Sequence, residues 1–128
     1  MERTLYNVRG EPIAYISDYP TKAIYLWDGH PAAYLYAYYV YGFNGSHLGW
    51  FVNDVVYDTG GNRIGFTSKT CPAPLHKEVG KGKKYPLDKP GPREEPPPLP
   101  DLSFSYSDED FEEFLKKGQL SLPEAVPE

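Results

Sequence analysis

Hydrophobic and polar positions follow the same order in four stretches of the first half of the chain. Each stretch begins with an aliphatic residue and a tyrosine, has glycine at its sixth position, alanine or glycine at its tenth, and an aromatic residue at its eleventh. The stretches are LYNVRGEPIAYI (5–16), IYLWDGHPAAYL (24–35), VYGFNGSHLGWF (40–51) and VYDTGGNRIGFT (56–67). Because they align without a gap, the pattern indicates one supersecondary unit that is repeated four times.

Each unit is predicted to be a β-hairpin. The fifth and sixth positions read Arg-Gly, Asp-Gly, Asn-Gly and Gly-Gly, and the last three pairs are strong signals for a tight turn. The flanks are rich in Tyr, Val, Ile, Phe and Trp, which favour strands. A two-residue type I′ turn and a three-residue loop with a left-handed glycine both fit, and the pattern does not choose between them.

The four hairpins are expected to associate, since a single hairpin is marginal in water. Both faces of each hairpin are partly apolar, which favours packing around a common centre over one open sheet. The small residue at the tenth position would let a neighbouring hairpin or ring approach closely. We therefore predict an all-β fold, with four consecutive hairpins in a small pseudo-fourfold barrel-like assembly, a proline-rich linker and a short C-terminal α-helix.

This series of motifs resembles a bacterial family, the 4-fold β flower proteins. The segments that carry the resemblance are AYI, WDGHPAAYL, NGSHLGWF and GNRIGF, in this order within residues 4–67, and DEDFEEFL in the tail is similar in style. The resemblance implies a shallow, symmetric antiparallel β structure with the hairpins as petals. It implies no activity and therefore no catalytic residues. Thr59, where the other three units have a larger apolar side chain, is the weakest match.

The second half of the chain has a different composition. Residues 68–128 contain eleven of the fourteen prolines and no tryptophan, whereas residues 1–67 contain ten of the twelve tyrosines. An extended, partly polyproline-II segment is expected, either as a stiff spacer or, at EEPPPLP (94–100), as a ligand for an aromatic groove. The predicted division of the chain is 1–68 for the β domain, 69–103 for a Pro/Lys-rich linker and 104–128 for a docking helix and tail.

A short helix is predicted within SYSDEDFEEFLKKGQ (105–119). Ser107 can cap its start, acidic residues fill the first turn, and Gly118 is placed to end it. So short a helix is unstable alone, so its apolar face must dock, either on the β core or in a groove of a partner protein. The residues of that face are Phe111, Phe114 and Leu115.

Charge and hydropathy bear on partners and location. The net charge of −5 argues against nucleic acid as a main partner. Lys81, Lys83 and Lys84 lie in a locally basic stretch that could contact anionic lipid. The chain has no apolar run long enough for a transmembrane helix and no apolar signal region, so we expect a cytoplasmic protein. Its one cysteine excludes an intrachain disulfide.

The sequence contains no recognisable catalytic motif, and we expect no enzyme activity, no cofactor and no metal site. His30 and His47 lie next to hairpin turns, where two histidines alone do not make a metal site. If the hairpins bind a ligand, the expected residues are those at the hairpin tips or the central axis. These are His30, His47, Trp27, Trp50 and Arg63.

Five tyrosines occur in YLYAYYVY (34–41), without a clean alternation, so some rings are expected to face outward. Tyr36, Tyr38 and Tyr39 are therefore predicted to form a surface for a protein partner or for self-association. The first functional hypothesis is a non-enzymatic binding or scaffold module for proteins. The alternatives are a module that associates with a lipid surface and a binder of small ligands at the pseudo-fourfold axis, where tyrosine and tryptophan rings would line a pocket or form the core.

Overall fold

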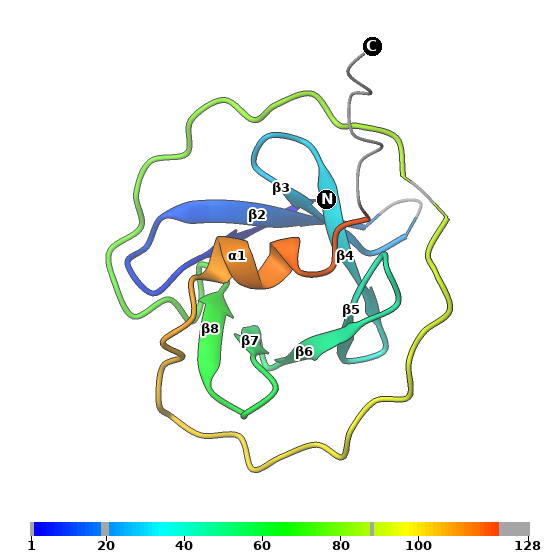
Figure 1. Ribbon diagram of the computed structural model, residues 1–128. Helices are drawn as coiled ribbons and strands as arrows, with labels where there is room; N and C mark the ends of the chain where they lie inside the picture. Colours follow the sequence, from blue (N-terminus) through cyan, green and yellow to red (C-terminus); the bar gives the residue numbers. More distant parts are fainter. Residues whose placement is uncertain (1, 19–20, 88, 121–128) are drawn as a thin grey trace.

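The computed structural model describes residues 2–18, 21–87 and 89–120, which form a closed eight-stranded antiparallel barrel with one short helix (Figure 1). Each strand pairs with the next strand in sequence, and the last returns to the first. The strands are β1 (Arg3–Tyr6), β2 (Pro12–Ser17), β3 (Ala23–Leu26), β4 (Pro31–Tyr36), β5 (Tyr39–Gly42), β6 (His47–Val52), β7 (Val55–Tyr57) and β8 (Arg63–Phe66). The all-β prediction with four consecutive hairpins, here called the first to fourth petals, is confirmed.

All four petals turn in the same way. In the first petal, the backbone N–H of Gly10 donates to the carbonyl of Asn7 at 3.0 Å, and the N–H of Asn7 donates to the carbonyl of Glu11 at 3.0 Å. The other petals repeat this pair of hydrogen bonds. Glycine has the positive φ in each turn, from +84° to +98°, and the residue before it does not. Of the two turns that fit the sequence, the longer loop with a left-handed glycine is therefore the one formed.

The centre of the barrel is filled by side chains. One buried cluster takes aliphatic residues from all four petals and three residues from the helix α1 (Phe111–Lys116). Its members include Leu5, Ile16, Ile24, Val40, Val56, Phe111, Phe114 and Leu115. A ligand on the pseudo-fourfold axis would have to displace this cluster. The aromatic rings of the repeat, which were considered for the axis, pack in separate clusters with residues of the tail.

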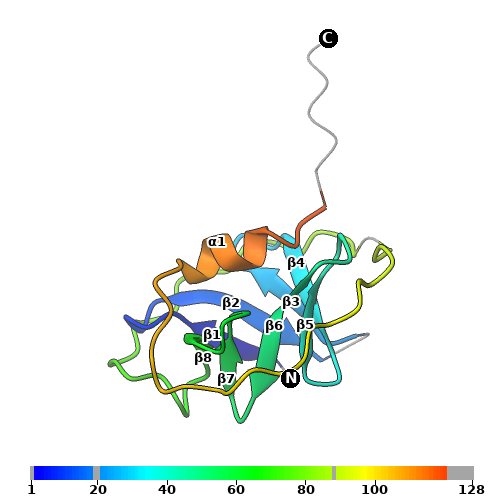
Figure 2. The same ribbon diagram turned by 60° about the horizontal axis from the view of Figure 1, so that its bottom comes forward.

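The helix α1 lies across one end of the barrel (Figures 1 and 2). Its Phe111 ring lies over Gly65, where an added Cβ would come within 2.5 Å of the ring, and Phe114 similarly approaches Gly49. The small residue at the tenth position of these two units therefore makes room for two aromatic rings. The docking helix lies on its own barrel, so its apolar face is buried within the chain.

The helix begins later than predicted, and its cap is a different residue. Asp110 is the N-cap, with an extended backbone and a carboxylate that accepts from the N–H of Glu113 at 3.0 Å. The expected cap, Ser107, lies in a stretch that still pairs with β8, where its backbone N–H donates to the carbonyl of Arg63 at 2.8 Å. This bond keeps the chain extended along β8. Gly118 follows the helix as expected, and its Cα lies directly against Gly42.

The segment expected as a linker runs around the outside of the barrel and passes each petal tip in turn (Figure 1). We call residues 74–87 and 89–103 the belt. One backbone N–H of the belt donates to the carbonyl of the turn glycine of each petal, at intervals of nine residues along the belt. His76, Tyr85, Glu94 and Ser103 donate to Gly10, Gly29, Gly45 and Gly61 at 2.9, 3.0, 2.9 and 2.9 Å.

The turn glycines also allow the belt to approach closely. A Cβ on Gly10, Gly29 or Gly45 would lie 2.1, 2.0 or 2.1 Å from a belt carbonyl oxygen, and one on Gly61 would lie 2.6 Å away. Each of these positions therefore requires glycine for two reasons, the left-handed backbone and the contact with the belt. The fourfold repeat of the barrel is matched by a fourfold set of backbone contacts from the tail.

Candidate functional site

The outer face of the hairpin between β4 and β5 carries four tyrosines in two directly opposed pairs. Tyr34 pairs with Tyr41, and Tyr36 pairs with Tyr39, with ring centroids 6.2 and 6.5 Å apart. The expectation that this run lacks a clean alternation is wrong, because Ala37 and Tyr38 form a two-residue turn. On either side of that turn, the tyrosines point outward and their neighbours point toward the barrel interior. The result is a ladder of stacked rings.

The two ends of this ladder differ in exposure. Tyr34 and Tyr41 are buried, and the Tyr41 hydroxyl donates to the belt carbonyl of Glu94 at 2.9 Å. Tyr36 is 49% exposed, and Tyr38, whose ring stacks on Tyr39 at 4.7 Å, is 43% exposed. The belt thus covers one end of the ladder and leaves the other open.

Arg93 of the belt joins the open end. Its guanidinium carbon lies 3.9 Å from the centroid of the Tyr36 ring, and Nη1 donates to the Tyr34 hydroxyl at 3.3 Å. A guanidinium held over a ring face is attracted by the ring quadrupole and keeps most of its donors free. We call Tyr36, Tyr38, Tyr39 and Arg93 the tyrosine surface. It brings the three predicted tyrosines together with an arginine that the sequence did not single out.

Beside the tyrosine surface, on the neighbouring strand β6, lie two of the predicted residues, His47 and Trp50. The His47 ring is 5.7 Å from the Tyr39 ring and 4.7 Å from the Trp50 ring, and the His47 backbone N–H donates to a Glu94 carboxylate oxygen at 2.6 Å. His47 is 6% exposed and Trp50 is fully buried. Neither nitrogen of the His47 ring, nor the indole nitrogen of Trp50, has a hydrogen-bond partner among the residues that the structure describes. Burial lowers the pKa of His47, which favours its neutral form.

The other predicted tip residues bind the belt and do not gather in one place. His30 stacks on Tyr85 with centroids 3.8 Å apart. The indole N–H of Trp27 donates to the carbonyl of Val79 at 3.2 Å. Arg63 Nε donates to the carbonyl of Ser103 at 3.3 Å. Because the tips point outward to different parts of the belt, the structure forms no common site from them.

The lysines considered for lipid contact are partly engaged inside the chain. Lys81 Nζ and Lys84 Nζ each lie 2.7 Å from a carboxylate oxygen of Glu2, and Lys81 Nζ also lies 4.3 Å from the centroid of the Tyr15 ring. Burial raises the pKa of that tyrosine to about 12. The carbonyl of Lys83 makes the close contact with Gly29. Within the described part of the chain, no helix is long and apolar enough to cross a membrane.

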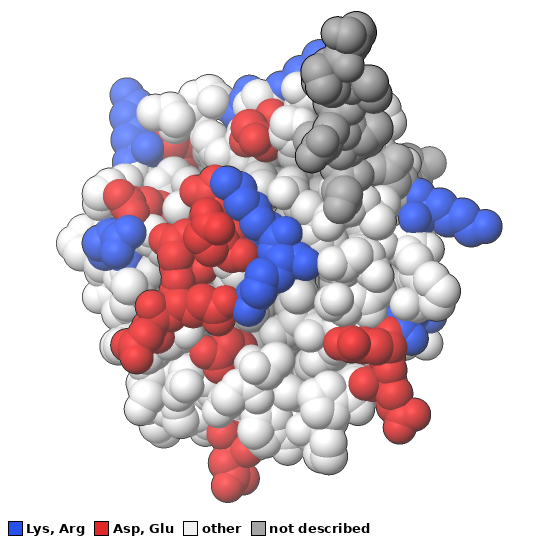
Figure 3. All heavy atoms as spheres, viewed as in Figure 1, with Lys and Arg blue, Asp and Glu red and all other residues white. Residues whose placement is uncertain are grey.

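The exposed side of α1 is highly charged. Acidic and basic side chains lie next to each other over the helix end of the barrel (Figure 3). Lys116 Nζ is 3.3 Å from a Glu112 carboxylate oxygen, and Lys117 forms an ion pair with Glu109. The predicted contact residues Phe111, Phe114 and Leu115 are buried under this surface, so in this structure they are not available to a partner.

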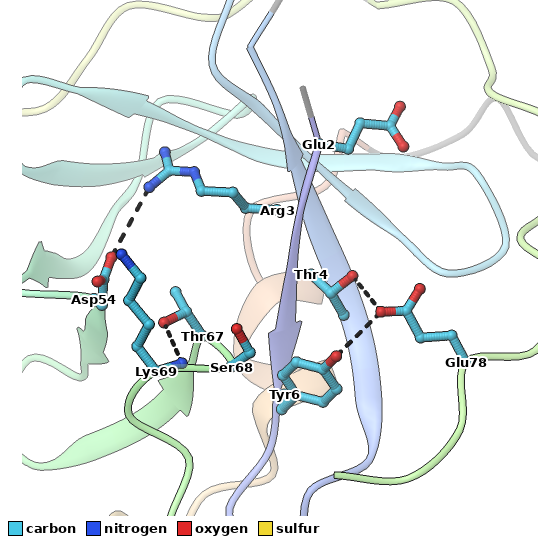
Figure 4. A pocket seen from close by; sticks show the side chains of 9 residues that line it. All are labelled: Glu2, Arg3, Thr4, Tyr6, Asp54, Thr67, Ser68, Lys69 and Glu78. Atoms are coloured by element: carbon cyan, nitrogen blue, oxygen red, sulfur yellow. Dashed lines mark hydrogen bonds and ion pairs between the residues drawn. The ribbon is translucent and has the colours of Figure 1, made fainter.

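A polar cleft that the sequence analysis missed lies where the barrel closes (Figure 4). The structure records one residue pair between β1 and β8, Tyr6 with Phe66, whereas β2 and β3 pair at four positions. The cleft between β1 and β8 has a volume of about 290 Å³. Its lining residues carry charges of both signs or hydroxyl groups and include Arg3, Thr4, Asp54, Lys69 and Glu78.

Most of the polar side chains of this cleft already have partners inside the chain. The Glu78 carboxylate accepts from the hydroxyls of Thr4 at 2.8 Å and Tyr6 at 3.1 Å (Figure 4). The signal that could have found the cleft is Thr67, which occupies the twelfth position of its unit, where the others have Ile16, Leu35 and Phe51. After Thr67 the chain turns away from the barrel. The turn is held by the Thr67 carbonyl, which accepts from the backbone N–H groups of Thr70 and Cys71.

Among the residues that the structure describes, no three His, Cys, Asp or Glu side chains gather as a metal ion would require. The arrangement offers instead an exposed aromatic surface with one guanidinium, and a polar cleft whose groups pair with one another. The first is suited to binding another molecule by stacking and hydrogen bonding.

Comparison with known proteins agrees with the architecture. No curated protein and no solved structure is significantly similar to this chain. A family model does match, over residues 3–115, which include the whole barrel, the belt and most of the helix. Since the match extends over far more than half of the chain, the protein belongs to the family described as the 4-fold beta flower protein.

Proposed function

We propose that this protein is a non-enzymatic protein-binding module and that the tyrosine surface is its contact site. The observation that supports the proposal is the exposure of Tyr36 and Tyr38, at 49% and 43%, in a stacked array that Arg93 completes. Tyrosine and arginine are the residue types most often found at the energetic centres of protein interfaces. Large rings that are fixed before binding lose little conformational entropy when a partner arrives.

The scaffold around these residues supports such a role. Tyr36 and Tyr39 stand on two paired strands, and Tyr38 lies in the two-residue turn that joins them, so the barrel sets the spacing of the rings. The lipid alternative has less support, because Glu2 offsets part of the charge of Lys81 and Lys84. A cytoplasmic setting in a bacterium is part of the same proposal. The single cysteine, Cys71, is in keeping with a reducing compartment, where structural disulfides are rare.

A selection from a random peptide library on the full chain tests this function. Peptides that bind the wild-type protein should lose at least about tenfold in affinity for the double variant Tyr36→Ala, Tyr38→Ala, which corresponds to about 1.4 kcal/mol. Tyr106→Ala is the matched control, because Tyr106 is 48% exposed at another place on the molecule. The proposal fails if the selected peptides bind the double variant as well as they bind the control.

A further inference from the structure

We infer that the partner of the tyrosine surface is an extended, proline-rich segment of another protein with an acidic residue beside its prolines. The inference rests on the proposed function and specifies the chemistry of the ligand. It comes from what the neighbouring part of the same aromatic exterior already binds, namely the belt.

The belt shows how this exterior binds an extended, proline-rich chain. Two aromatic donors reach carbonyls of the belt, Trp27 Nε1 to Val79 and the Tyr41 hydroxyl to Glu94. Leu87 of the belt packs against the same aromatic cluster. An extended polyproline-like chain has no internal hydrogen bonds, so its carbonyls are available to such donors. Rings that stack on prolines while their N–H or O–H groups bind carbonyls are the means by which aromatic grooves recognise proline-rich segments.

The tyrosine surface is continuous with this intramolecular interface. Tyr34 and Tyr41, which the belt covers, form one rung of the ladder, and Tyr36 and Tyr39 form the next. The same kind of ring therefore continues past the edge of the belt. A second extended segment could lie beside the belt. It would contact Tyr36 and Tyr39 as the belt contacts Tyr34 and Tyr41.

Arg93 adds a preference for charge. Its guanidinium lies over Tyr36, one nitrogen donates to the Tyr34 hydroxyl, and the residue is exposed. A guanidinium has five N–H donors, so several are left for a carboxylate of the partner. An acidic residue next to the prolines would face this group. The chain contains a segment of this composition, EEPPPLP (94–100), which makes a second copy the competing occupant.

Calorimetric titration of the full chain with defined peptides tests the inference. The probes are EEPPPLP, the proline-free EEAAALA and the uncharged QQPPPLP. We expect EEPPPLP to bind at least about tenfold more tightly than EEAAALA, and Tyr36→Ala to remove that difference while Tyr106→Ala keeps it. Arg93→Gln should weaken EEPPPLP severalfold and leave QQPPPLP unchanged. Circular dichroism on each variant confirms that the barrel is folded.

The outcomes separate the inference from the function on which it rests. If EEPPPLP binds no better than EEAAALA, while library peptides without proline still depend on Tyr36 and Tyr38, the inference is overturned and the proposed function stands. If neither set depends on these tyrosines, both are overturned. Sedimentation of the protein without peptide tests whether a second copy of the chain is the occupant. A dimer that the Tyr36→Ala substitution dissociates would overturn the inference of a separate partner protein.

Discussion

The barrel and the belt both repeat four times around the same axis, but different interactions hold them. In the barrel, each repeat is recognisable by its side chains, because aliphatic and small residues must fill a shared interior. In the belt, the four donors to the petal tips are His76, Tyr85, Glu94 and Ser103, which have nothing in common except a backbone N–H. Symmetry that depends on side chains is visible in a sequence, whereas symmetry that depends on the backbone leaves little trace there and becomes clear in a structure.

The comparison predicts where each region is sensitive to substitution. The barrel should be sensitive at positions of its interior, and the belt should be sensitive only where its main chain meets a petal tip. Elsewhere in the belt, exposed side chains without a partner should accept substitution. Four experiments test this difference.

The largest effect is expected at the helix that fills one end of the barrel. Phe114→Ala should lower the free energy of unfolding by about 3–5 kcal/mol, because it leaves a cavity against Gly49. Phe104→Ala is the control, since Phe104 in the tail is exposed and contacts Arg63 through a cation–π interaction. The control should lose less than about 1 kcal/mol. Urea denaturation measures both, and equal losses would contradict a structural role for the helix.

The next effect concerns a petal tip. Gly29→Ala should lower the free energy of unfolding by about 1–2 kcal/mol or more, because Gly29 has φ +98° and a Cβ there would collide with the carbonyl of Lys83. Gly80→Ala, in the belt, is the control. A Cβ on Gly80 meets no atom of the described residues within 4 Å, so its effect should stay within about 0.5 kcal/mol. Chemical denaturation measures both variants. Equal free energies of unfolding for the two would contradict a stabilising contact between the belt and the petal tip.

A third experiment uses pH to compare the two regions where they meet. His47 is buried between the barrel and the belt, and burial lowers its pKa below the ordinary value of about 6.5. The unfolded chain therefore binds more protons than the folded chain. Stability should be fully present above about pH 6.5 and should fall as pH decreases from there toward the folded pKa.

Replacement of His47 checks this dependence. The variant His47→Gln should show a smaller loss of stability below about pH 6.5 than the wild type. His76→Gln, which changes an exposed histidine of the belt, is the matched control and should follow the wild-type curve. Thermal melting across pH 5 to 8 measures the difference between the curves. Identical curves for wild type and His47→Gln would contradict the burial of a neutral histidine at this junction.

The smallest effect is expected at the turn that carries the tyrosine surface. Ala37 has φ +54°, a left-handed conformation that disfavours alanine, so Ala37→Gly should raise stability by up to about 1 kcal/mol. Asn53 has φ +51° in the corresponding turn between β6 and β7, and asparagine tolerates this conformation. Asn53→Gly should therefore change the melting temperature less. A larger gain at Asn53 than at Ala37 would contradict the argument.

The sequence predicts the barrel well because its rules are local. The turn glycines, the aliphatic and tyrosine pairs and the small residue at the tenth position each have a physical reason in the structure. The choice of turn was left open because the residue pairs fit both loops. The helix start was misplaced at Ser107, since its pairing with Arg63 joins two distant parts of the chain. Local patterns do not record such pairings.

The candidate site was predicted only in part, and for an incomplete reason. Tyr36, Tyr38 and Tyr39 were identified from their number, but the two-residue turn that aligns the rings was not. Arg93 could not be found, because more than fifty residues separate it from the tyrosines. The belt gives one weak sign of its repeat. Gly82 and Gly91, nine residues apart, donate to the carbonyls of Trp27 and Phe43.

The nine-residue interval of the belt sets the spacing of its contacts around the barrel. An extended chain of nine residues spans roughly 28 Å, and each such length must bring the next N–H to the next turn glycine. Between these contacts, the number of residues is fixed more strictly than their identity. One inserted residue would shift every later contact out of position. It would also shift the point at which the chain turns inward to start α1. In this protein, the count of residues in an unstructured-looking tail is therefore a stricter requirement than their chemistry.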